Sequence, residues 1–98
     1  MSTSTALRKR QRKISSLNEQ RATLAAKAEE LRQFITYCES EEFQQILSAK
    51  SDEVHKLVAY SKVNSRKELN ELTLRITDLD ARVNELERVI TALSILKK

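Results

Sequence analysis

The chain of 98 residues contains no glycine and no proline. Glycine supplies the positive φ angles of tight turns and the close backbone approach of phosphate-binding loops, and proline presets the backbone of other turns. A chain that lacks both has few means of joining strands by short reversals, and it also lacks the two strongest helix breakers. The sequence therefore predicts an all-α protein made of long helices.

The composition favours coiled-coil packing of these helices. Charged residues make up 33% of the chain and aromatic residues only 4%, which is typical of coiled coils and long helices. The hydrophobic fraction of 40% is too high for a disordered chain. Because the chain is short, we expect residues 1–98 to form a single helical coiled-coil domain.

The first helix is expected over about residues 5–38, after polar residues at 2–5 that can cap a helix. Apolar residues recur in it at alternating spacings of three and four, which is the pattern of a seam that faces another helix. Two arginines interrupt this stripe. Its a and d positions are, in order, Leu7, Arg10, Ile14, Leu17, Arg21, Leu24, Ala28, Leu31, Ile35 and Cys38.

A second helix is expected over about residues 41–62. Ser40 precedes it, and Glu41 and Glu42 place negative charge in its first turn, where the helix dipole favours it. The polar run from Ser48 to Glu53 is a weak segment at which this helix is expected to bend or loosen.

The third helix, over about residues 65–97, has the strongest pattern. Ser65 and Glu68 have the spacing of a capping box. The second helix does not share the register of this seam, which indicates a break or a stutter near residues 62–65. The alternative is one continuous helix from residue 41, which would make a two-helix hairpin. The a and d positions of the seam are Leu69, Leu72, Ile76, Leu79, Val83, Leu86, Ile90 and Leu93.

The unequal helix lengths predict an oligomer. An antiparallel hairpin or bundle of two or three such helices leaves part of an apolar stripe uncovered, and exposed stripes are normally buried by another chain. The seam of the third helix is the expected interface, with a homodimer favoured or a helical protein as partner. Its a positions are mostly β-branched and its d positions are all leucine, which favours a parallel pair in which Arg75 would face Asp80 of the other copy. An antiparallel pairing with the first helix would instead bring Lys27 near Arg75.

No set of residues in the sequence predicts an active site. His55 is the only histidine, and Cys38, the only cysteine, falls on the apolar stripe, so we expect no catalytic residues, no metal and no cofactor. A lone cysteine cannot form an internal disulfide and favours a reducing compartment. The chain shows neither a secretory signal nor an apolar stretch of about 18 residues. We expect a cytoplasmic or nuclear protein that is not an enzyme and has no membrane partner.

The positive charge of the chain is concentrated near its beginning. Residues 1–38 carry a net charge of +5 and residues 39–98 a net charge of −1. Basic residues in the first turns of a helix oppose the helix dipole, so they are expected to serve another interaction, either with nucleic acid through its phosphates or with an acidic partner. The cluster consists of Arg8, Lys9, Arg10, Arg12 and Lys13.

Two functions fit these patterns. The first is a helical adaptor or assembly subunit that acts by coiled-coil self-association and protein–protein interaction. The alternative is a nucleic-acid-binding accessory or regulatory protein that uses the basic N-terminal arm, or a protein inhibitor of a nucleic-acid enzyme.

Overall fold

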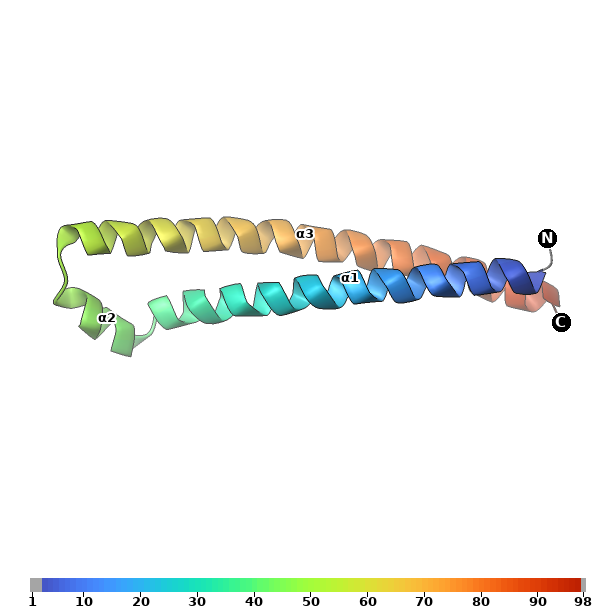
Figure 1. The fold of residues 1–98 in the computed structure, drawn as a ribbon, viewed down its shortest axis with the longest axis horizontal. Helices are drawn as coiled ribbons and strands as arrows, with labels where there is room; N and C mark the ends of the chain where they lie inside the picture. Colours follow the sequence, from blue (N-terminus) through green and yellow to red (C-terminus); the bar gives the residue numbers. More distant parts are fainter. Residues whose placement is uncertain (1–2, 98) are drawn as a thin grey trace. The chain divides into compact units, whose positions relative to one another are not determined.

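The computed structural model of the protein describes residues 3–97, and the side chains of residues 3–96. It has three helices, α1 (Thr3–Cys38), α2 (Glu41–Ser48) and α3 (Asp52–Lys97), as shown in Figure 1. Two long helices, α1 and α3, pack antiparallel as a hairpin, and the short α2 lies between them in the chain. The prediction of an all-α hairpin is confirmed.

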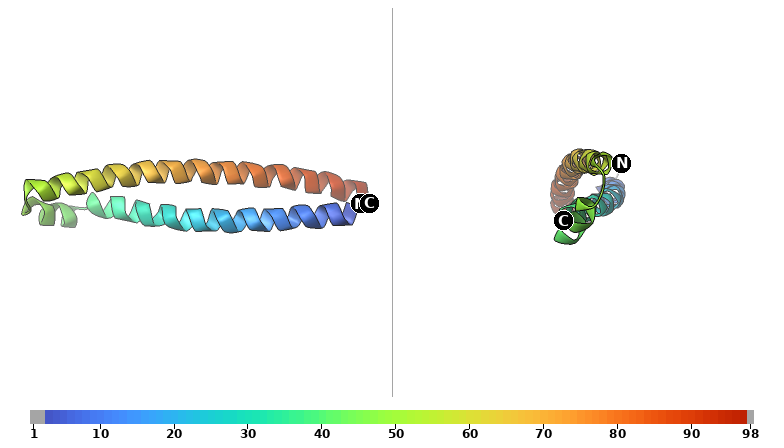
Figure 2. Two further views of the ribbon diagram at one scale, coloured as in Figure 1. Left: turned by 45° about the horizontal axis from the view of Figure 1, so that its top comes forward. Right: turned by 90° about the vertical axis from the view of Figure 1, so that its left-hand side faces the viewer.

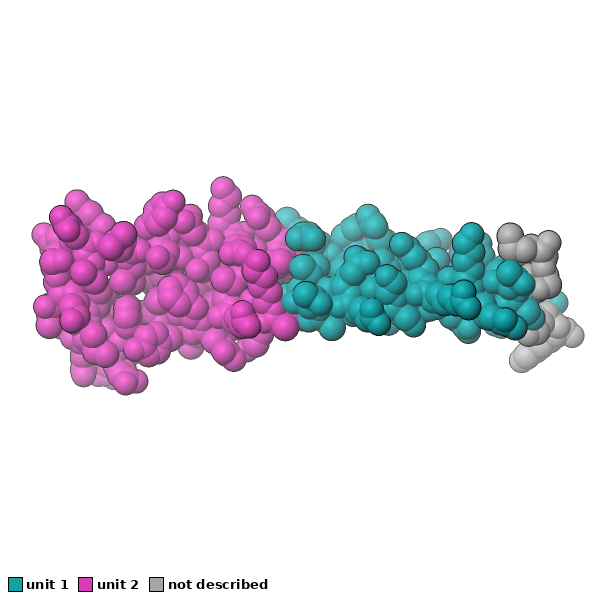
Figure 3. Space-filling view, in the orientation of Figure 1, with its two compact units in different colours: residues 1–24, 74–98 teal, residues 25–73 magenta. Residues whose placement is uncertain are grey.

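The chain divides into two compact units, coloured in Figure 3. Unit 1 consists of residues 1–24 and 74–98, and unit 2 of residues 25–73. Each unit therefore contains one segment of α1 and one segment of α3, and unit 2 also contains α2. Figure 2 shows that within unit 1 the beginning of α1 (blue) lies beside the end of α3 (red).

The core of each unit lies along the stripe predicted for α1. Leu17, Ala28 and Cys38 are at most 2% exposed, and the other a and d positions of α1 are all partly buried. In unit 1, Leu17 packs with Leu79 and Val83 of α3. Ile14, Leu24 and Leu86 surround this cluster. The alternating spacing thus identified the packed face, because residues three and four apart share one side of a helix.

The predicted break at residues 62–65 is wrong, and so is the predicted second helix over 41–62. Helix α3 runs without interruption from Asp52, so Ser65 and Glu68 are interior helical residues and form no capping box. The chain reverses earlier, after Ser48, inside the polar run that was expected only to weaken a helix.

The packed face of α3 keeps the register of the seam across residue 62, where a change was expected. Partly buried residues at positions 58, 62, 65 and 69 follow the spacing of the seam, and the one extra spacing of four, a stutter, lies earlier, between 54 and 58. A continuous helix can absorb such an insertion by a local change in supercoiling. Without glycine or proline in this stretch, nothing in the backbone favours ending the helix there.

The predicted break near residues 39–41 is confirmed. Ser40 has an extended backbone (φ −69°, ψ 150°) and caps α2, because its Oγ accepts a hydrogen bond from the backbone N–H of Phe43 at 3.2 Å. At the next break, the N–H of Val54 donates to Ser51 Oγ at 3.4 Å. No described residue has a positive φ. The reversal between α1 and α3 is therefore made in two short steps, each followed by a serine-capped helix.

Candidate interaction surfaces

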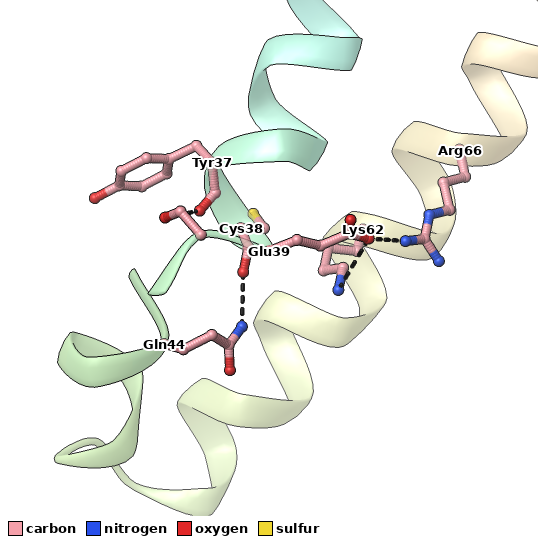
Figure 4. A network of polar contacts seen from close by, with 7 residues as sticks. Tyr37, Cys38, Glu39, Gln44, Lys62 and Arg66 are labelled. Atoms are coloured by element: carbon pink, nitrogen blue, oxygen red, sulfur yellow. Dashed lines mark hydrogen bonds and ion pairs between the residues drawn. The ribbon is translucent and has the colours of Figure 1, made fainter. Parts of the chain in front are cut away.

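Glu39, the first residue after α1, joins the end of α1 to α3 within unit 2 (Figure 4). Its Oε1 forms an ion pair with Arg66 and a second, at 3.6 Å, with Lys62 Nζ. On the other side of the turn, Gln44 of α2 donates from Nε2 to the carbonyl oxygen of Cys38 at 2.7 Å. These contacts hold all three helices of unit 2 together at the turn.

This turn supports an apolar groove of about 260 Å³. The rings of Tyr37 and Phe43 pack at a centroid distance of 5.1 Å, so α1 and α2 share one aromatic contact. Residues from all three helices line the groove, namely Phe34, Tyr37, Cys38, Phe43, Val54, Leu57, Val58 and Ser61.

Several large apolar side chains of unit 2 remain exposed at and beside this groove. Phe34 and Tyr37 are 41% and 47% exposed, and Leu57 is 66% exposed. Tyr60, 68% exposed, lines a neighbouring hollow together with Leu57. We refer to Phe34, Tyr37, Leu57 and Tyr60 as the unit 2 apolar surface. The sequence pattern alone did not predict this surface.

The predicted oligomer interface has a packing partner within the chain. Of its eight residues, Leu72, Leu79 and Val83 are buried and the others partly buried. In unit 1, three of them pack against α1, as described above. A role for this seam in oligomerisation stays a prediction, and it would require the helices to separate or exchange partners.

The charged residues that were considered for pairing between copies form contacts within the hairpin. Asp80 accepts a hydrogen bond from Arg21 Nε at 2.6 Å. Lys27 Nζ, which was expected near Arg75 in an antiparallel pairing, forms an ion pair with Glu68 at 2.9 Å. The antiparallel arrangement therefore brings opposite charges together at both places.

The basic cluster lies on α1 in unit 1. Arg8, Lys9, Arg12 and Lys13 are exposed, whereas Arg10 is partly buried and donates from Nη1 to the carbonyl oxygen of Ala6 at 3.3 Å. None of the five has an ion pair with a described acidic residue. Outside the cluster, seven basic side chains do form ion pairs: Arg21, Lys27, Arg32, Lys62, Arg66, Arg82 and Arg88.

The histidine and the cysteine of the chain differ in their exposure to solvent. His55 is exposed on α3, and Cys38 is buried with a free thiol. Among the described residues, no three His, Cys, Asp or Glu side chains are grouped so that they could hold a metal ion. No helix in the described part of the chain is long and apolar enough to span a membrane.

No protein-family model, curated protein or solved structure matches this chain.

Proposed function

We propose that this chain is a non-enzymatic helical assembly protein that self-associates through the unit 2 apolar surface. The observation that carries the proposal is the exposure of two aromatic and apolar pairs, Phe34 with Tyr37 on α1 and Leu57 with Tyr60 on α3. Grouped large apolar side chains are a feature of interaction sites, and aromatic residues are enriched in interfaces.

The distribution of charge favours a second copy of the chain as the occupant of this surface. Unit 2 has seven basic and nine acidic residues, a net charge of −2, whereas unit 1 has eleven basic and five acidic residues, a net charge of +6. Two copies can approach through unit 2 with little repulsion, but an approach through unit 1 brings together two strongly positive surfaces.

The rim of the surface is also suited to pairing with itself. Glu53 and Lys56 line the same hollow as Leu57 and Tyr60. In a two-fold interface each contact occurs twice, with the roles of the two copies exchanged. Glu53 of one copy can therefore lie opposite Lys56 of the other, and the reverse. Such rim pairs contribute little affinity but disfavour wrong orientations.

Sedimentation equilibrium over the micromolar to millimolar range tests the proposal. We expect the wild-type protein to dimerise and the double variant Leu57→Glu/Tyr60→Glu to remain a monomer with unchanged helical circular dichroism. Leu74→Glu is the matched control, because Leu74 is 71% exposed on α3 in unit 1. This control should dimerise like the wild type.

Two results would contradict self-association through this surface. A wild-type protein that stays monomeric over the whole range would leave a helical protein partner as the occupant. A double variant that dimerises as well as Leu74→Glu would place the interface elsewhere, and the seam of α3 would then be the next candidate.

A further inference from the structure

We infer that the exposed basic side chains of α1 in unit 1 bind the phosphate backbone of double-stranded nucleic acid. The side chains are Arg8, Lys9, Arg12 and Lys13, which we refer to as the basic face. This binding would be an activity in addition to self-association, and it involves a different part of the chain.

The charge of the basic face is not compensated within α1. The first acidic residue of the sequence, Glu19, stands six positions after Lys13, so no carboxylate lies three or four positions from any residue of the cluster. Like charges at spacing four destabilise a helix slightly, and positive charge in its first turns opposes the dipole. A polyanion would relieve both effects, and the release of its counterions would favour binding.

The cations of the basic face lie close together on α1. Arg8 and Arg12 form one row on the helix, and Lys9 and Lys13 form the adjacent row, with about 6 Å of axial rise between the members of each row. Lys9, Arg12 and Lys13, together with Arg10, also border a depression of about 730 Å³, which includes Leu86 of α3. Three of the four cations thus lie around one depression of the surface.

The surroundings of the basic face favour a duplex over a single strand. Gln11, Ser15 and Asn18 are exposed nearby, and such side chains donate hydrogen bonds to phosphate and sugar oxygens. Unit 1 has no aromatic residue, so it lacks the stacking groups with which proteins hold single strands. Residues 3–24 expose no large apolar side chain, but Ile95 and Leu96 of unit 1 are 68% and 77% exposed. Because such side chains favour insertion into an anionic membrane, phospholipid vesicles are a competing ligand in the test below.

Fluorescence anisotropy with labelled DNA and RNA duplexes of unrelated sequences, over a range of salt concentrations, tests the inference. Four phosphate contacts predict a slope of about −3.6 for log affinity against log salt, and therefore roughly a 10²-fold loss of affinity between about 50 and 200 mM. We expect similar affinities for all duplex sequences.

Variants that remove two positive charges from different places test whether the basic face is the binding site. Arg8→Gln/Arg12→Gln should flatten the slope by about two units, since each lost contact removes about 0.9. Lys50→Gln/Lys67→Gln is the matched control, because both lysines are exposed on unit 2 without an ion pair to a described residue. It should keep the wild-type slope.

The inference is overturned if duplexes do not bind at about 50 mM salt, where phosphate contacts are strong. It is also overturned if the control pair flattens the slope as much as Arg8→Gln/Arg12→Gln, or if single strands or anionic phospholipid vesicles bind better than duplexes. Repeating the titration with Leu57→Glu/Tyr60→Glu, which keeps the basic face, separates this result from the test of self-association.

Discussion

Arg21 of α1 and Asp80 of α3 are joined across the hairpin by a hydrogen bond from Nε to Oδ1 of 2.6 Å. Arg21 occupies an a position of the stripe, where an apolar residue is usual. Its side chain is 43% exposed, so the guanidinium reaches the edge of the seam and meets the carboxylate there. A shift of α1 along α3 by one heptad would separate the two groups. This contact therefore favours one register of the hairpin.

The Arg21–Asp80 ion pair is expected to contribute a small, salt-sensitive free energy. A double-mutant cycle with Arg21→Gln and Asp80→Asn should give a coupling energy of about 0.2–1 kcal/mol in urea denaturation, because both side chains are nearly half exposed. At about 1 M salt the coupling should largely disappear. A coupling that is zero at low salt, or that persists at high salt, would contradict this assignment.

A second prediction concerns the core of unit 1. Leu79 is 7% exposed and packs against Leu17, so Leu79→Ala should lower the free energy of unfolding by about 2–4 kcal/mol. Leu74, on the same helix but 71% exposed, is the matched control, and Leu74→Ala should change it by less than about 0.5 kcal/mol. Denaturation at one fixed protein concentration measures both, since self-association would otherwise alter the apparent stability. If Leu79→Ala and Leu74→Ala lowered the free energy of unfolding equally, the seam of α3 would not be packed against α1.

The packed faces of the hairpin and its break near residues 39–41 could be predicted from the sequence, but the break between α2 and α3 could not. The faces follow from spacings of three and four that persist over many turns, so a single exception such as Arg21 does not obscure them. A break depends on a few capping contacts of about 1 kcal/mol each. Ser65 and Glu68 have capping-box spacing yet lie inside α3, whereas Ser51, which lacks that pattern, caps it.

The basic cluster and the unit 2 apolar surface could be predicted from the sequence to different degrees, because the exposure of each depends on the phase of its helix. The exposure of Arg8, Lys9, Arg12 and Lys13 follows from their places off the stripe, and the partial burial of Arg10 follows from its d position on the stripe. The exposure of Leu57 depends on the phase of α3 near the stutter. Val54 and Val58 are partly buried there, whereas Leu57 is 66% exposed.

The third prediction concerns Glu39. Replacing it by glutamine should lower the free energy of unfolding by about 0.5–1 kcal/mol, because the change removes the anion shared by Lys62 and Arg66. The Lys62 side chain is only 24% exposed, so water can only partly replace the lost carboxylate as a partner of its ammonium group. Glu29→Gln is the control, since Glu29 pairs only with Arg32 within α1, and its expected effect is below about 0.5 kcal/mol. If the two variants unfold alike, the shared contact at the turn has no special role.

The last prediction tests the continuity of α3 with proline. Ser65→Pro places a residue without an N–H inside a helix, where it also clashes with the preceding turn, and it should lower the free energy of unfolding by about 3 kcal/mol. Asp52→Pro places the same residue at the first position of α3, where proline is well tolerated because that N–H has no partner within the helix. Its expected cost is below about 1 kcal/mol, from the loss of an acidic first-turn side chain. Denaturant unfolding and the helical circular dichroism signal of the two variants give the comparison. If Ser65→Pro were as well tolerated as Asp52→Pro, the chain would have a helix start near residue 65, as the Ser65–Glu68 spacing had suggested, and α3 would not be one continuous helix.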